Sequence, residues 1–261
     1  MTTKLSEDDL LCIFDLFYDD RDLRSLCLCC KLFNQLLQPR LYYRIDLVGH
    51  KSHTKTVAAF RQLLERTPHL AHYPRKVDIS LRGCTMEDIE FVLAALTGKN
   101  ISFVALNAHG HGPVAAPVRR ALETFLRDTV IPLNVTISSF QAISASCLHL
   151  TQNLSLINTV IDPTGPPGVF RIKTLSIDNW GRCICIGAPF FSNVLPCLTH
   201  LMLSWEAPSG EPGGWYADLG AALDNMPKLI LFTVQYWGNN FTFNFEHIIQ
   251  RHCFSRWLHP R

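Results

Sequence analysis

The sequence has little that would support catalysis. It has no glycine-rich loop followed by Lys-Ser or Lys-Thr to hold a phosphate, and no Gly-x-Ser-x-Gly motif to present a nucleophilic serine. Its ten cysteines include Cys27, Cys29 and Cys30, but none has the paired two-residue spacing and distant second pair of a zinc module. No residues suggest a catalytic triad. We therefore expect no enzyme activity, no metal and no cofactor.

Charge is also sparse. Charged residues make up 18% of the chain and the net charge is +2, so bulk electrostatics do not favour nucleic acid. Residues 129–161 and 183–205 contain no Asp, Glu, Lys or Arg, and their length alone would permit a membrane span. Both stretches carry interior polar residues or prolines, which are costly in lipid. We expect them to form buried core, with no membrane and no nucleic acid as partners.

The chain lacks the basic-then-apolar start of a signal peptide, so we expect a cytoplasmic and/or nuclear protein with reduced thiols. Several cysteines lie among leucines and are expected to be small buried apolar residues: Cys12, Cys27, Cys30, Cys147 and Cys197.

Residues 1–47 predict a small helical unit. Ser6 is a candidate N-cap followed by three acids, and the acidic run that begins at Asp19 supplies a second N-cap. Apolar residues recur at helical spacing in Leu10, Ile13, Phe14 and Phe17. Pro39 predicts that the third helix ends before it. Three short helices bury little surface alone, so we expect a neighbouring domain or a partner to support them.

This segment resembles an F-box in its acidic helix start, its Leu-x-x-Ile-Phe core, its Asp-Leu-x-x-Leu second helix and its Pro-x-Leu-Tyr exit. The matching positions are Leu5, Glu7, Leu10, Ile13, Phe14, Leu16, Asp22, Leu23, Leu26, Cys30, Lys31, Phe33, Pro39, Leu41, Tyr42, Ile45 and Leu47. Ser6 departs from the family, which usually has proline there.

The resemblance implies docking on a Skp-type adaptor within a cullin–RING (SCF) ubiquitin ligase complex. The residues expected to contact that adaptor, or to support its contact helix, are Leu5, Leu10, Ile13, Phe14, Leu23 and Leu26. This chain would carry out no covalent step in ubiquitin conjugation and would act by proximity. The alternative is an ordinary N-terminal helical cap on a larger domain.

Residues 48–261 are expected to form one domain of repeated strands and helices. Strand-like triplets begin at Val77, Val104, Val135, Leu154, Leu175, Leu201 and Phe232, in steps of 19 to 31 residues. Helix-compatible runs lie at 86–96, 117–128 and 217–226. This pattern resembles a degenerate leucine-rich-repeat solenoid with a parallel sheet, although the usual asparagine after each strand is missing. The predicted fold class is therefore α/β. A doubly wound α/β domain is the alternative.

The solenoid would hold an unknown substrate protein on its open sheet face. Residues out of phase with the buried ones should lie there: Asp78, Ser80, Ala105, Thr136, Ser155, Ser176, Asp178, Met202, Ser204, Thr233 and Gln235. The same parity places Trp180 and Trp237 on that face or its rim, as the strongest candidates for substrate contact. Alternatively, both tryptophans fill gaps left by the missing asparagines. Two other function classes remain open, a scaffold with no ligase role and a hydrolase or transferase.

Overall fold

The computed structural model describes residues 6–17, 19–47, 56–108, 114–128, 133–140, 142–162, 169–178, 189–206, 225–238 and 241–248. At residues 189, 205–206, 234–238 and 241–248 it describes the backbone alone. Within these ranges the protein is a mixed α/β structure with seven α-helices and a mostly parallel sheet. This confirms the predicted α/β class.

Three helices come first: α1 (Glu7–Phe14), α2 (Asp20–Cys29) and α3 (Lys31–Leu41). We call them the N-terminal helical module. The predicted N-caps are confirmed, because the Ser6 hydroxyl accepts from the Asp9 N–H at 3.1 Å and the Asp19 carboxylate accepts from the Arg21 N–H at 2.8 Å. The Asp9 carboxylate also accepts from the Ser6 N–H, which completes a capping box.

The predicted end of the third helix before Pro39 is wrong, since α3 continues through Pro39 to Leu41. Proline lacks only one N–H, and in the last turn that removes a single helical hydrogen bond. The turn is held by the Tyr42 N–H, which donates to the Gln38 carbonyl at 3.0 Å. It is also held by burial, because Leu41 packs on the core of the helical module and Tyr42 on the core of the sheet.

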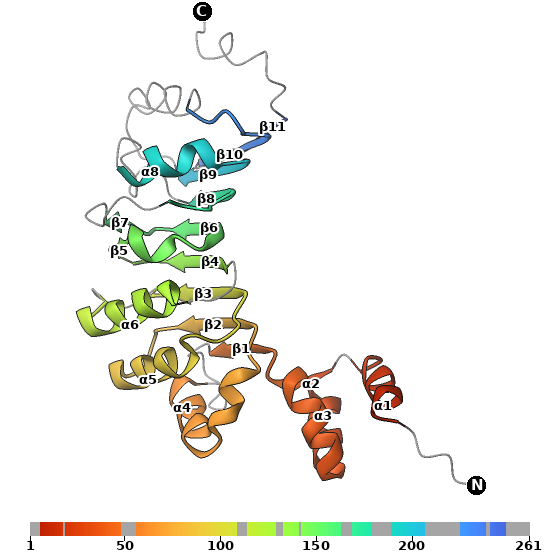
Figure 1. The fold of residues 1–261 in the computed structure, drawn as a ribbon. Helices are drawn as coiled ribbons and strands as arrows, with labels where there is room; N and C mark the ends of the chain where they lie inside the picture. Colours follow the sequence, from red (N-terminus) through yellow and green to blue (C-terminus); the bar gives the residue numbers. More distant parts are fainter. Residues whose placement is uncertain are drawn as a thin grey trace, which may run out of the picture.

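A nine-stranded sheet follows, with its strands side by side in chain order (Figure 1). The strands are β1 (Arg44–Leu47), β2 (Lys76–Ser80), β3 (Phe103–Asn107), β4 (Leu133–Ser138), β6 (Thr151–Ile157), β8 (Thr174–Asp178), β9 (His200–Glu206), β10 (Leu231–Gly238) and β11 (Phe241–Ile248). All neighbours pair in parallel except β10 and β11, which are antiparallel. All seven predicted strand triplets lie inside these strands. The order of the described strands never reverses, whereas a doubly wound sheet has such a reversal.

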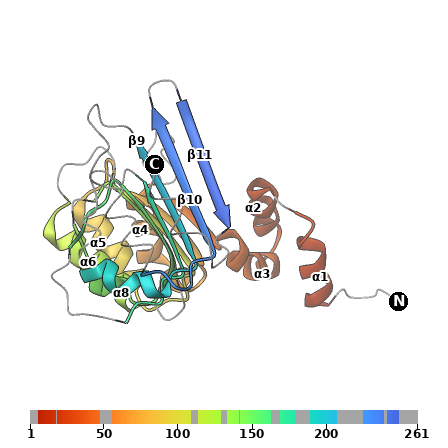
Figure 2. The ribbon, with the colours of Figure 1, turned by 90° about the horizontal axis from the view of Figure 1, so that it is seen from above.

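Helices cover one side of this sheet, as Figure 2 shows for α4 (Val57–Arg66), α5 (Met86–Leu96), α6 (Ala116–Arg127) and α8 (Pro189–Val194). Short 3-10 helices (Pro68–His72, Ala145–Leu148 and Leu195–Cys197) and a small parallel pair, β5 (Ile143–Ser144) with β7 (Ile161–Asp162), complete the described elements. The predicted helix at 86–96 is confirmed, and the one at 117–128 begins and ends one residue earlier. The third, at 217–226, lies mostly outside the described residues.

The core lies between the sheet and these helices. Alternate strand residues point into it, and the register aligns them across the sheet in one row: Ile45, Val77, Val104, Val135, Leu154, Leu175, Leu201 and Phe232. All members of this row are buried, and three of them, Val77, Val104 and Leu175, expose none of their surface. The helical module has a separate small core of Phe14, Leu23 and Leu37.

The alternation of rows predicts a large loss of stability at one residue of β8 and almost none at its neighbour. Leu175→Ala should lower the free energy of unfolding by about 2 to 5 kcal/mol, because it empties a fully buried site. Ser176→Ala, on the other face, should change it by no more than about 0.5 kcal/mol. Urea denaturation followed by circular dichroism measures both, and equal losses would contradict the assigned faces.

Candidate interaction surfaces

The N-terminal helical module buries some of the residues expected to contact an adaptor. Phe14 and Leu23 are only 2% and 4% exposed, and the Phe14 ring meets that of Phe33 edge-on with 5.0 Å between centroids. These two residues therefore support the helices from inside. Leu10 and Leu26 are half-buried against the same core, whereas Ile13 is 40% exposed. Leu5 lies outside the described residues.

Other apolar side chains of the module lie on its surface. From sequence alone, they were not among the residues expected to contact a partner. Leu28 is 88% exposed and Leu16 is 72% exposed, while Leu11 and Leu32 each expose about two fifths of their surface. Together with Ile13 we call these residues the exposed apolar set of the module. Surface leucines in this number on so small a unit favour a partner that covers them.

The prediction that all cysteines near leucines are buried is wrong for Cys12 and Cys30, which are exposed. Cys147 is buried as predicted, and Cys27 and Cys197 are half-buried. Cys30 is exposed because it lies between two helices in extended conformation, as the N-cap of α3. Its Sγ accepts from the Phe33 N–H at 3.5 Å.

The open face of the sheet, which the helices leave uncovered, carries two rows of residues in register. The first holds Asp46, Asp78, Ala105, Thr136, Ser155, Ser176, Met202 and Thr233, and the second holds Ser80, Asn107, Ser138, Ile157, Asp178, Ser204 and Gln235. The residues predicted for the substrate face fall in these rows, apart from Trp180 and Trp237. Asp178 is half-buried and Met202 is 37% exposed. Ser204, however, is buried at 8% exposure, so its position in the row does not make it accessible.

Trp180 lies outside the described residues. Trp237 and Gln235 lie in β10, where their backbones pair with Glu206 and Ser204 of β9, but only the backbone is described there. Two other positions that lack the repeat asparagine are informative. Phe140 and Thr159 are both buried. The Thr159 Oγ1 lies 3.1 and 2.9 Å from the Ile137 and Ile157 carbonyl oxygens, which share its one hydroxyl proton, and it accepts from the Phe140 N–H at 3.3 Å. At these positions, the Phe140 ring and the Thr159 side chain fill the interior in place of asparagine.

Charge on the open face gathers at its first two strands. Arg44, Asp46, Lys76 and Asp78 line a shallow cavity of about 140 Å³ with Val77 and Phe103. The Arg44 Nε donates to the Asp46 carboxylate at 2.9 Å, whereas the Lys76 ammonium lies over the Tyr43 ring, 5.9 Å from its centroid. Burial raises the pKa of the Asp78 carboxyl, and the neighbouring Asp46 carboxylate raises it further, against the opposing effect of Arg44.

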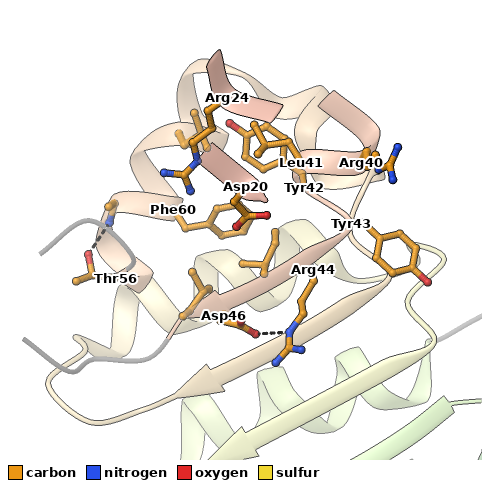
Figure 3. A pocket seen from close by; sticks show the side chains of 14 residues that line it. Asp20, Arg24, Arg40, Leu41, Tyr42, Tyr43, Arg44, Asp46, Thr56 and Phe60 are labelled. Carbon is orange, nitrogen blue, oxygen red and sulfur yellow. Dashed lines mark hydrogen bonds and ion pairs between the residues drawn. The ribbon is translucent and has the colours of Figure 1, made fainter. Parts of the chain in front are cut away.

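A larger cavity of about 350 Å³ lies where the helical module meets the sheet (Figure 3). One wall comes from Asp20 and Arg24 of α2. The others come from residues 40–47, which run from the end of α3 through β1, and from the first two turns of α4 with the preceding Thr56. Burial is also the main reason why the pKa of Tyr42 in this wall is raised. Sequence alone could not indicate this cavity, because its walls come from three segments that meet only in the fold.

Comparison of the sequence with protein-family models gives no match, and comparison with curated proteins gives none. Within the described ranges, no three His, Cys, Asp or Glu side chains gather as metal ligands would. The helices described there are also too short or too polar for any of them to cross a bilayer.

Asp78 predicts a pH-dependent effect on stability. Its raised pKa means that the folded state disfavours the ionised carboxyl, so the penalty is present above the folded-state pKa and disappears as pH falls below the ordinary value of 3.8. Asp78→Asn should therefore raise the free energy of unfolding at pH 7, and the gain should vanish near pH 3. Urea titrations at both pH values measure it, and a gain that persists at pH 3 would show that charge is not the cause.

The cysteines predict a sharp contrast in reactivity. Burial, aided by the Glu123 carboxylate, raises the pKa of the Cys147 thiol to about 12, so almost no thiolate forms at pH 8. Brief treatment of the folded protein with iodoacetamide should label the exposed Cys12, Cys29 and Cys30 and spare Cys147. Peptide mass spectrometry gives the extent at each site, with urea-unfolded protein as the control in which Cys147 reacts too.

Proposed function

We propose that the chain is a substrate-recognition adaptor of an SCF-type ubiquitin ligase. The helical module is an F-box that docks on a Skp-type adaptor, and the sheet with its helices is a leucine-rich-repeat-like solenoid that holds a substrate protein. The observation that carries this proposal is the exposed apolar set of the module, which its own small core does not use. The resemblance of residues 5–47 to an F-box is the second support for the proposal.

The separation of the two hydrophobic cores favours a docking module over a simple cap. A cap would bury its apolar residues against the end of the sheet, whereas Phe14, Leu23 and Leu37 pack with one another. Figures 1 and 2 show α1–α3 beyond the ends of the strands, away from α5, α6 and α8. Ile13, Leu16 and Leu28 thus remain free for another protein.

Consecutive parallel strands with helices on one side support the solenoid part of the proposal. Each strand and its return segment add one unit to a continuous core, and the uncovered face is the usual binding surface of such repeats. On this face the charged residues at β1 and β2 give way to small neutral ones, namely Ala105, Thr136 and Ser155. A substrate would therefore meet a flat, mostly uncharged surface with a charged end.

Two substitutions test docking without disturbing the module core. Ile13→Asp and Leu28→Asp place a charge on side chains that are 40% and 88% exposed. Each should weaken binding to a co-expressed Skp-type adaptor by about tenfold or more, because a buried interface would have to take up an unpaired charge. Co-purification followed by calorimetry on the purified partners measures the loss.

Val169→Asp is the matched control, since Val169 is 88% exposed but belongs to the sheet domain. It should bind as the unaltered chain does, and all three variants should unfold at the same temperature. If the unaltered chain does not bind the adaptor, or if the two module variants bind normally, the docking proposal is wrong. A scaffold without a ligase role, the reading favoured by Ser6 in place of proline, would then be the better description.

A further inference from the structure

We propose that the free edge of β1 binds an extended, acidic peptide segment in the cavity between the helical module and α4. This site is distinct from the open sheet face and from the exposed apolar set of the module, so it does not depend on the proposed function. The inference rests on the backbone geometry of β1, on the shape of the cavity and on its uncompensated positive charge.

Among the described strands, β1 has a neighbour on one side only. The Tyr43 carbonyl accepts from the Arg75 and Lys76 N–H groups at 2.8 and 3.0 Å, so Tyr43 directs its backbone polar groups toward β2. Backbone groups alternate between the two sides of a strand, and Arg44 and Asp46 therefore direct their N–H and C=O groups toward the free edge. Such an edge binds another extended backbone, which supplies the matching donors and acceptors.

The cavity lies along this edge and is large enough for such a segment. At about 350 Å³ it is lined by all four residues of β1, and opposite them by the first turns of α4 and by α2. Its wall holds apolar side chains, including Leu41, Phe60 and Leu63, beside polar ones. These would contact the side chains of a bound strand, while the backbone groups of Arg44 and Asp46 would hold its main chain.

The charges around the cavity select an acidic occupant. Arg40 is paired with Asp15 at 2.7 Å and Arg44 with Asp46 at 2.9 Å, so these two cations are already compensated. Arg24 has no ion-pair partner among the described residues, and Figure 3 shows it extending from α2 toward Phe60.

The remaining acid of the wall, Asp20, lies in the first turn of α2 and is balanced by the positive end of that helix. The first turn of α4, which begins after Thr56 and borders the cavity, holds no acid. Its positive end therefore adds to the charge of Arg24, and a carboxylate side chain on the bound strand would compensate both.

A peptide mixture tests the site on the full chain without a known ligand. Immobilised protein is incubated with hexapeptides that carry glutamate at one fixed position and degenerate residues elsewhere, and with the same mixture carrying lysine instead. Retained peptide, measured by mass spectrometry, should be about tenfold greater for the glutamate mixture, as expected for a charge-assisted hydrogen bond. Equal retention of the two mixtures, or no retention of either, would overturn the proposal.

Two pairs of variants locate the binding. Asp46→Pro removes an outward N–H that β1 does not use to pair with β2, and it should abolish retention, whereas Asp46→Asn keeps that N–H and should retain the peptides. Arg24→Glu should reverse the preference to lysine, whereas Arg21→Glu, on the same helix but outside the cavity wall, should not. Thermal unfolding confirms that all four variants fold. Full retention by Asp46→Pro would overturn edge pairing.

A second copy of the chain could also occupy the edge, and sedimentation velocity distinguishes this outcome. The proposal expects a monomer at the protein concentrations used for peptide binding. A dimer that Asp46→Pro dissociates would show that the edge pairs with itself, and would overturn the acidic peptide as its occupant.

Discussion

The register of the parallel strands is the constraint on which the rest of the structure depends. Each strand pairs with the next in chain order, and along the central strands the same positions stay aligned apart from a single shift between β4 and β6. Because side chains alternate between the two faces, this alignment turns a local pattern into continuous rows. Apolar rows stabilise the layer of helices, and the remaining rows form the open face. Charged residues can therefore enter the strands only where they do not face the core.

The structure of the helical module is limited by how much apolar surface it can bury. Its core of Phe14, Leu23 and Leu37 is small, and a unit of this size cannot cover all its leucines. Side chains such as Leu16 and Leu28 thus remain on the surface, where water contact is unfavourable. A partner that covers them would gain the burial that the module lacks. The cavity beside β1 arises because the module packs with itself instead of against the edge of the sheet.

Much of the sheet could be predicted from the sequence because its signal is local. A strand triplet needs only two apolar residues around a small or polar one, and a helix such as α5 begins at a capping threonine, Thr85. The first helix was equally readable from Ser6 and Asp9. The strand β11, which pairs antiparallel with β10, and the helix α4 were not predicted. The buried residues of α4, Val57, Phe60 and Leu64, keep helical spacing, but they lie in the basic stretch from Lys51 to Lys76, which was not interpreted as a helix.

The surfaces were harder to predict, for physical reasons. Cys27 and Cys30 keep helical spacing, but the chain leaves the helix at Cys30, so the two do not share one face. Ile13 and Phe14 are neighbours on α1 and therefore point in different directions, one outward and one into the core. Ser204 has the parity of an exposed residue yet is buried, because exposure depends on what packs above it. Such packing is a property of the assembled chain.

The proposed function depends on docking of the helical module, with the sheet keeping its own structure. Hydrogen–deuterium exchange of the full chain, with and without a saturating Skp-type adaptor, tests that docking. We expect slower exchange within α1 and α2, at residues 7–29, with unchanged exchange in strands β2 to β9. Unchanged exchange in those two helices, or protection confined to the strands, would contradict it.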